Sequence, residues 1–418
     1  MGFTCRSDRH FIRPTYRSNR FVLVEIVAPE RRREPTREPI NIGFVLDRSG
    51  SMGGRKIGFA RQAVIEAIGA LDERDRFSVV AYDDRIDVVV ESRLATDEGR
   101  RDARRLVEAI DARGRTDLFA GWMRGCEQVA AHQVAGDVNR VLLLSDGLAN
   151  VGVTDPRELE RHAAALHVRG LRTDTFGVGS DFDEKLLEAM AVAGGGHSYF
   201  IEQEVQIRDF ITSAVGEALD VVARDVRLEV SVPDGVLVEP IGRFATTVDG
   251  DRRVVELGDL VSGQRLELVL RLNFPFGDIG RSMRATFRLR DAEGVLDHQE
   301  LAIAWEYADH RTNDLQPRDR DVDRAVARRF AARVRQEALD LNRRGDFDAA
   351  ALRLQAVAVR IRGYAGGDDE LLRIAQELEG ERGWFAAPMA ASAVKQAHFR
   401  SSYEMRGRDI RGRAQRGS

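Results

Sequence analysis

The chain has 418 residues, of which 43% are hydrophobic, and this is enough to bury two or more hydrophobic cores. Its 64 basic and 68 acidic residues leave a formal net charge of −4, so bulk charge points neither to nucleic acid nor to an anionic membrane. Two cysteines are too few for a disulfide scaffold, and no apolar run is long enough for a signal peptide or a membrane span, so a soluble protein of the reducing cytoplasm is expected.

The first strand pattern covers 21–26 and lies in an N-terminal segment of residues 1–37. A stretch rich in arginine and proline separates this strand from the elements that follow. An unpaired strand edge is an aggregation hazard, so we expect the strand to join a β-sandwich formed later in the chain. The domain predicted over 38–220 would then be an insertion in that sandwich.

Short β-rich runs alternate with amphipathic helical stretches over 38–220, which predicts an α/β fold with a doubly wound, mostly parallel, Rossmann-like sheet. Three residues join the strands over 76–82 and 86–90, too few for a crossover, so this pair should be an antiparallel hairpin at the sheet edge. The predicted strands cover 40–46, 76–82, 86–90, 139–145, 171–178 and 198–201, and the predicted helices cover 56–71, 98–110, 119–132, 156–167, 184–193 and 206–219.

After residue 220 the hydrophobic period changes to two, which predicts a β-sandwich over 221–310. The runs that show this period cover 226–232, 266–272, 283–289 and 301–305. A C-terminal helical region follows over 318–380, with helices expected over 322–343, 347–361 and 368–380. The last segment, 381–418, is rich in basic residues and poor in apolar pattern, so we expect a basic, flexible tail.

Oxygen-bearing side chains follow two of the predicted strands. Asp47-Arg-Ser-Gly-Ser51 comes after the first buried strand and has the spacing Asp-x-Ser-x-Ser, and Asp146 follows the strand over 139–145. Ligands of open α/β sheets bind beyond the carboxyl ends of the strands, so these two loops are expected to meet. Asp-x-Ser-x-Ser alone is commonly a turn or a helix cap, but carboxylate and hydroxyl oxygens are also the ligands that Mg²⁺ prefers.

These residues resemble the motif of the von Willebrand factor A (vWA) family, in which Asp-x-Ser-x-Ser joins a distant Thr and a distant Asp. The distant Thr matches Thr116 in Gly114-Arg-Thr-Asp-Leu-Phe-Ala-Gly121, and the distant Asp matches Asp146 in Leu144-Ser-Asp-Gly147. The resemblance extends over 175–179 and 194–200 and so covers roughly residues 40–220. The sequence departs from the family pattern at Arg115, where bacterial relatives often have glycine. The arginine side chain is expected to narrow the approach to Thr116.

The resemblance implies a metal-ion-dependent adhesion site that holds one Mg²⁺ or Mn²⁺. The implied ligands are Asp47, Ser49, Ser51, Thr116 and Asp146. Gly50, Gly147 and Asp117 would support these ligands, although Asp117 fits an N-cap of the helix that starts at Leu118 equally well. By the same analogy the two aspartates act largely through water or hydrogen bonds, which leaves the ion short of negative charge and ready for an acidic group of a partner protein.

Two binding roles stay open under this resemblance. One is a standalone interaction module, and the other is an adaptor subunit of a MoxR-type or chelatase-type AAA ATPase system. A β-sandwich after the vWA domain also occurs in relatives of inter-alpha-trypsin inhibitor heavy chains, but those proteins are secreted, whereas the expectation here is a bacterial cytoplasmic protein.

Catalysis by this chain is not expected, and no catalytic residue is assigned. Lys56 lacks the following hydroxyl that a Walker A phosphate loop requires, and Ser49 lacks the preceding glycine of a nucleophile elbow. A phosphatase motif of the Asp-x-Asp type would need an acid where Ser49 stands. A metal-dependent hydrolase or phosphatase is therefore the least favoured alternative.

Overall fold

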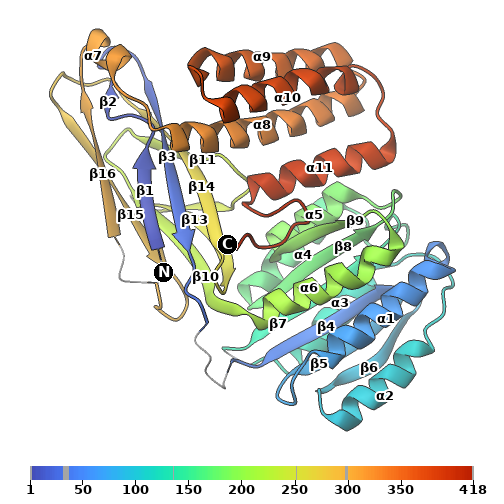
Figure 1. The fold of residues 1–418 in the computed structure, drawn as a ribbon. Helices are drawn as coiled ribbons and strands as arrows, with labels where there is room; N and C mark the ends of the chain where they lie inside the picture. The colour runs from blue at the N-terminus through green and yellow to red at the C-terminus, as the bar shows by residue number, and fades with distance from the viewer. Residues whose placement is uncertain (1, 32–36, 135, 251, 297–299, 417–418) are drawn as a thin grey trace. The chain divides into compact units, whose positions relative to one another are not determined.

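The computed structural model describes residues 2–31, 37–134, 136–250, 252–296 and 300–416. The chain divides into two units (Figure 1): Arg33–Asp220 forms one, and Met1–Arg32 together with Val221–Ser418 forms the other. In the part of the chain that the structure describes, no helix has both the length and the apolar character needed to cross a membrane.

The unit Arg33–Asp220 is built on a six-stranded sheet in the order β6-β5-β4-β7-β8-β9. All neighbouring strands are parallel except β5 and β6, which form an antiparallel pair at one edge. The prediction of a mostly parallel α/β sheet with an edge hairpin is confirmed. The strands are β4 (Ile40–Asp47), β5 (Arg76–Tyr82), β6 (Ile86–Leu94), β7 (Val138–Ser145), β8 (Leu171–Val178) and β9 (Gly195–Ile201).

Helices cover both faces of this sheet (Figure 1), and the interior strands β4, β7 and β8 are buried along their whole length for this reason. The helices are α1 (Arg55–Gly69), α2 (Asp97–Glu108), α3 (Leu118–Ala130), α4 (Pro156–Val168), α5 (Glu184–Ala193) and α6 (Ile207–Leu219), with short 3-10 turns η1 (Gly50–Met52) and η2 (Glu204–Gln206).

Glycine brings α3 close to the central strand. A Cβ atom at Gly125 of α3 would lie 2.2 Å from a methyl group of Val45 on β4, so only glycine fits at this position. Another close approach is made at Gly121, where a Cβ atom would lie 2.4 Å from the ring of Tyr82. The first half of α3, and with it the loop that carries Thr116, is thereby held against β5 and β4.

The second unit contains a β-sandwich of two sheets, in the orders β1-β3-β14-β11 and β12-β13-β10-β15-β16-β2. The strand expected over 21–26 lies within β3, which pairs antiparallel with β14 over ten residue pairs, among them Val24 with Leu268. The strands are β1 (Gly2–Ser7), β2 (Phe11–Ile12), β3 (Ser18–Val27), β10 (Val221–Ser231), β11 (Leu237–Pro240), β12 (Thr246–Asp249), β13 (Arg252–Val261), β14 (Arg265–Phe274), β15 (Ser282–Arg290) and β16 (Glu300–Tyr307).

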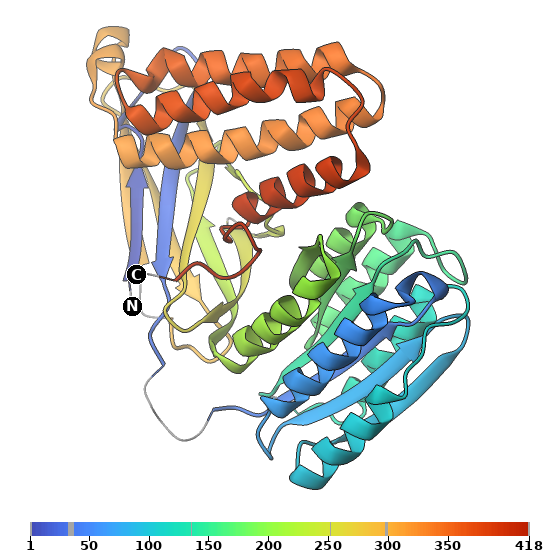
Figure 2. The ribbon, with the colours of Figure 1, turned by 45° about the vertical axis from the view of Figure 1, so that its right-hand side comes forward.

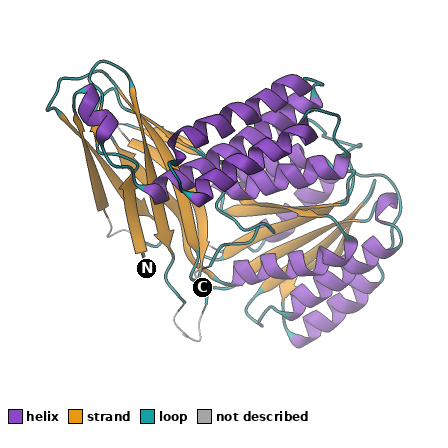
Figure 3. Cartoon of the chain, turned by 45° about the horizontal axis from the view of Figure 1, so that its top comes forward, coloured by secondary structure: helices purple, strands orange, loops and turns teal. Residues whose placement is uncertain are grey.

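The hydrophobic core of the sandwich is formed by the apolar side chains that recur at every second position of its strands. Leu228 and Val230 of β10, Phe287 of β15 and Trp305 of β16 are fully buried and pack with Val24 of β3. Figure 3 distinguishes this all-β part, drawn in orange, from the helices of the same unit, drawn in purple.

Helices complete the second unit. The long helix α8 lies on the outer face of β3 and β14, where Val322 and Val326 pack with Phe21, Leu23 and Val269. Figure 2 shows α8, α9 and α10 side by side, in orange and red. The helices are α7 (His310–Leu315), α8 (Arg320–Arg343), α9 (Phe347–Ala365), α10 (Asp369–Phe385) and α11 (Ala391–Met405).

The prediction of a flexible tail over 381–418 is wrong for its described residues. Helix α10 continues to Phe385, and α11 packs on α8 with Phe399 and Tyr403 buried. Beyond α11, the N–H of Arg265 donates to the carbonyl oxygen of Gln415 at 2.8 Å. The apolar spacing of four between Phe399 and Tyr403 outweighs the basic composition, because it supplies a face that the other helices cover.

Candidate metal site

The two acidic candidates meet because β4 and β7 are neighbours in the sheet. Leu46 pairs with Leu144, so the strands end at the same edge and Asp47 lies beside Ser145. The Ser145 hydroxyl donates to Asp47 Oδ2 at 3.0 Å, and the backbone N–H of Ser49 donates to Asp47 Oδ1 at 2.8 Å. The position of Asp47 is therefore fixed by both strands and by its own loop.

Asp47 is fully buried, and burial raises its pKa to about 6, even though the hydroxyl and N–H donors around it favour the charged form. The Tyr82 hydroxyl also contacts Asp47 Oδ2, at 3.5 Å. A buried carboxylate with so little solvation favours the approach of a cation, which would lower this pKa and recover part of the lost hydration energy.

Hydroxyl groups extend from Asp47 toward the surface in a connected row. Ser49 Oγ lies 3.0 Å from Ser51 Oγ, and the Ser51 hydroxyl donates to Asp146 Oδ1 at 2.6 Å. Ser49 and Asp146 are buried, whereas Ser51 is exposed. The row therefore opens to solvent at Ser51.

Thr116 completes the set from a third loop. A Cβ atom at Gly147 would lie 3.7 Å from Ser51 Oγ and 3.9 Å from Thr116 Oγ1, so both hydroxyl oxygens border the space beside this glycine. Gly114 has a φ of +71°, and its carbonyl oxygen accepts a hydrogen bond from the N–H of Gly50 at 3.1 Å. The structure thus brings together all five predicted ligands and places Gly50 and Gly147 between the loops.

Asp117 acts as a helix cap. Its Oδ1 accepts a hydrogen bond from the N–H of Ala120 at 3.0 Å at the start of α3, so of the two roles considered for this residue the structure shows the N-cap. Arg115 is exposed beside Thr116. His197 lies on β9 and Cys126 on α3, both outside the loops of the site, and burial raises the pKa of the Cys126 thiol.

Two residues at the site were missed by sequence reasoning. The Lys56 ammonium donates to Asp146 Oδ2 at 2.5 Å and to the carbonyl oxygen of Ser51 at 3.3 Å. Asn150 accepts the N–H of Thr116 through Oδ1 at 3.1 Å, and its own N–H donates back to the Thr116 carbonyl oxygen at 3.2 Å. Lys56 balances the charge of Asp146, and Asn150 holds the Thr116 loop in place.

Ion pairs, one of them buried, connect the loops of the site. Arg48, which lies between the first two motif residues, forms ion pairs with Asp83 and Asp87, and Arg113 binds Asp83 at 2.8 Å. Burial raises the pKa of Asp83, but the hydrogen bond from Arg113 and the charge of Arg48 outweigh it and lower the pKa overall. These pairs tie the Asp47 loop to the loop before Thr116, since the N–H of Arg113 also donates to the Arg48 carbonyl oxygen at 2.7 Å.

The donor set fits a hard divalent cation. It offers two carboxylates and three hydroxyls, and Mg²⁺ takes oxygen ligands and usually one or two carboxylates. Within the described ranges there is no group of three or more histidine, cysteine, aspartate or glutamate side chains placed to hold a metal.

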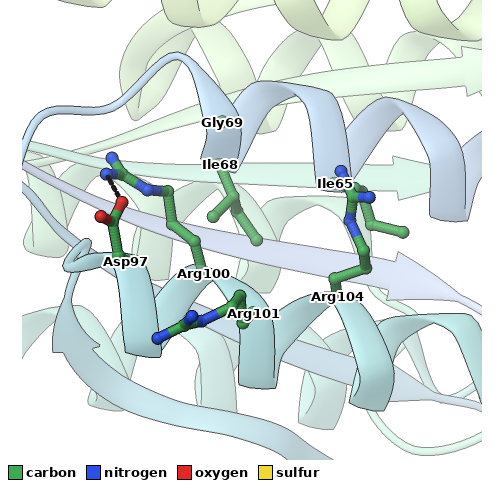
Figure 4. Close-up of a pocket in the computed structure, with 7 residues that line it drawn as sticks. All are labelled: Ile65, Ile68, Gly69, Asp97, Arg100, Arg101 and Arg104. Atoms are coloured by element: carbon green, nitrogen blue, oxygen red, sulfur yellow. Dashed lines mark hydrogen bonds and ion pairs between the residues drawn. The ribbon is translucent and has the colours of Figure 1, made fainter.

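A separate hollow in the same unit, of about 440 Å³, lies between α1 and α2 and is lined by none of the five predicted ligands. Figure 4 shows Arg100 turned toward Asp97, with Ile65 and Ile68 of α1 on the other side. Arg100 also donates to the carbonyl oxygen of Leu71 at 2.8 Å, so its guanidinium group is used in joining the two helices.

A comparison with known protein families gives a match within the unit Arg33–Asp220. The family described as von Willebrand factor type A domain matches residues 41–213, which include all five predicted ligands. The chain contains a vWA domain. The resemblance inferred from the sequence motifs is thereby confirmed.

Relatives of the vWA domain come from bacteria and animals. The chain is 26% identical to the Escherichia coli protein YfbK over 302 residues, which is 70% of this chain and 52% of YfbK. It is 28% identical to human inter-alpha-trypsin inhibitor heavy chain H4 over 197 residues, 45% of this chain and 21% of that protein. The chain thus spans about half the length of YfbK and a smaller part of the heavy chain.

Two solved structures share the fold over nearly the whole chain. A von Willebrand factor type A protein from Catenulispora acidiphila superposes with a TM-score of 0.71 and 21% identity, over 95% of this chain and 89% of that one. The ArnB paralog VWA2 from Sulfolobus acidocaldarius gives a TM-score of 0.59 at 17% identity, over 96% and 98%. The fold of nearly the whole chain is therefore shared with these two proteins.

Proposed function

We propose that the vWA domain binds one Mg²⁺ or Mn²⁺ ion and that a carboxylate of a partner protein coordinates this ion. The proposed ligands are Asp47, Ser49, Ser51, Thr116 and Asp146. The observation that carries the proposal is the meeting of three loops at one edge of the sheet, where the row of oxygens opens to solvent at Ser51. Domains of this family commonly serve as metal-dependent protein–protein interaction modules.

A cation at this place would keep unneutralised positive charge. Three of the proposed ligands are neutral hydroxyls, and the carboxylate of Asp146 is shared with Ser51 and Lys56. An incoming Asp or Glu side chain, or a C-terminal carboxylate, gains both coordination and Coulomb energy in such a partly desolvated place.

The role is binding rather than catalysis. The hydroxyls of Ser49 and Ser51 are bonded to each other and to Asp146, and the hydrogen bonds that the structure describes for these hydroxyls include none to an imidazole. The Asp146 carboxylate lies within reach of Ser51 as a general base would, but its other oxygen is engaged by the Lys56 ammonium, which disfavours proton uptake. A metal-dependent hydrolase or phosphatase is the unfavoured alternative.

Metal binding is tested by calorimetric titration of the full chain with MnCl₂. We expect one ion per chain, and we expect binding to be lost when Asp47→Ala is combined with Ser49→Ala. A Thr154→Val variant, which alters an exposed threonine of the same domain, serves as the matched control and keeps binding. Full binding by the double variant would place the metal elsewhere.

Partner binding is tested by affinity capture with Mg²⁺, with EDTA, and with a Thr116→Val variant. Valine keeps the volume of threonine and removes only the hydroxyl, so partner binding should fall while folding is retained. An AAA ATPase among the captured proteins would support the finer proposal of an adaptor for a MoxR-type or chelatase-type system, and another protein would support a standalone module. Equal capture under all three conditions contradicts the mechanism.

A further inference from the structure

A cavity of about 230 Å³ lies in the second unit, where β3 meets α8 and α9. None of its lining residues belongs to the vWA domain, so it is independent of the metal site. Its apolar lining is formed by Phe21, Val326, Phe330, Val357, Ile361 and Tyr364.

Three arginines line the same cavity. Arg9 pairs with Asp8 at 3.1 Å, and Arg318 pairs with Asp323 through Nε at 2.8 Å. Arg360 is exposed on α9, with its guanidinium carbon 5.6 Å from the centre of the Phe330 ring. Within the described ranges no acidic side chain forms an ion pair with Arg360, so the cavity carries positive charge that the protein leaves unbalanced.

The neighbouring groups add to this excess of positive charge. Arg20 is buried, and burial together with the charges of Arg9, Arg13 and Arg318 lowers its pKa to about 10. Asp8 opposes this shift but does not cancel it. The positive charges around the cavity therefore favour the binding of an anion in it.

The lining also contains one neutral hydrogen-bonding group, the hydroxyl of Tyr364. The Tyr364 ring lies 5.0 Å from the guanidinium carbon of Arg318, and burial raises the pKa of its hydroxyl to about 12, so the hydroxyl keeps its proton. No hydrogen bond to this hydroxyl is found within the described part of the chain. Tyr364 is therefore available as a neutral donor beside the arginines.

We propose that this cavity binds a small organic carboxylate whose apolar body lies among the aromatic and aliphatic side chains and whose carboxylate faces Arg360. An apolar cavity of about 150 Å³ accepts a benzene ring, so the larger space here admits a ring with a short side chain. Pockets of this kind combine an apolar lining with few charged groups that fix the orientation of the ligand. Arginine suits the headgroup because its planar fork matches a carboxylate.

The test uses 3-phenylpropanoate and the neutral alcohol of the same shape, 3-phenylpropan-1-ol, titrated calorimetrically into the full chain. We expect the carboxylate to bind at least about tenfold more tightly than the alcohol, which corresponds to one charge-assisted contact. Arg360→Gln should remove this difference. Arg353→Gln changes another exposed arginine of α9 outside the cavity and should leave it intact.

A second variant tests the place of binding. Val357→Phe fills part of the cavity from α9 and should abolish binding of 3-phenylpropanoate while the circular dichroism spectrum is retained. Equal affinities for acid and alcohol, unchanged binding by Arg360→Gln, or no binding at millimolar concentration would each overturn the proposal.

Discussion

The loop site of the vWA domain and the cavity beside α8 and α9 differ in the source of their positive charge. Around Asp47 and Asp146 the groups are carboxylates and neutral hydroxyls, and the positive charge of Lys56 is neutralised by Asp146. The cavity has three arginines of its own, and Arg360 is not paired with any acid of the described residues. An anion at the first place depends on an added cation, whereas an anion at the second depends only on side chains.

Chelation should separate the two regions most strongly. We expect EDTA to weaken binding of a carboxylate-bearing partner by about 30-fold or more, because a charge contact in a partly buried place is lost. The affinity for 3-phenylpropanoate should not change. Titrations of both ligands with and without EDTA measure this, and a parallel loss of both affinities would show that the two regions are not independent.

Removing a structural arginine from the cavity should have the next largest effect. Arg318→Gln leaves the buried Asp323 with Arg320 alone, at 3.6 Å, and should cost about 2 kcal/mol of unfolding free energy. Arg360→Gln removes a charge that no acidic side chain of the described residues pairs with, and it should cost less than about 0.5 kcal/mol. Amide hydrogen exchange in α8 and β3 reports both values. Similar costs for the two variants would contradict the distinction between a paired and a free arginine.

Replacing Lys56 at the proposed metal site should have a smaller effect of the opposite sign, because it should strengthen rather than weaken binding. Its ammonium group contacts the carboxylate of Asp146 and would repel a cation bound there. Lys56→Met should therefore tighten Mn²⁺ binding by about fivefold, the effect of roughly 1 kcal/mol that two charges about 4 Å apart exert in water. Lys185→Met, an exposed lysine of α5, is the control. Weaker Mn²⁺ binding by the Lys56 variant would mean that this lysine mainly positions Asp146.

The smallest effect concerns the shape of the charged group in the cavity. Arg360→Lys keeps the positive charge but loses the planar fork, so the affinity for 3-phenylpropanoate should fall by about threefold. Calorimetry resolves this change. A loss as large as that of Arg360→Gln would show that geometry matters there more than charge.

The sequence predicted the meeting of the Asp47 and Asp146 loops better than it predicted the cavity, because of how each region is assembled. Asp47 and Asp146 each follow a strand, so the rule for open α/β sheets brought their loops together, and the match of Thr116 came from the family motif. Lys56 and Asn150 were missed, since neither belongs to the motif and nothing local shows that a side chain turns toward Asp146 or Thr116.

The cavity could not be predicted from sequence patterns. Arg9, Arg318 and Arg360 come from three separate segments, and each by itself has the pattern of an ordinary exposed arginine. The tail was misjudged for a related reason: Lys395 and His398 are buried, although a basic composition is typical of solvated chain ends. Tertiary packing, rather than local pattern, decides such positions.

The pairing of β3 with β14 also has a consequence for folding during synthesis. Glu25 and Arg265, which form an ion pair across these two strands, are 240 positions apart in the chain. The vWA domain lies between them, and all strands of its sheet are synthesised before β14. At the usual rate of about 5–20 residues per second, β3 waits on the order of ten seconds or more for β14 on the ribosome. One edge of β3 can already pair with β1, but the edge that β14 later covers stays free for chaperones or other nascent chains.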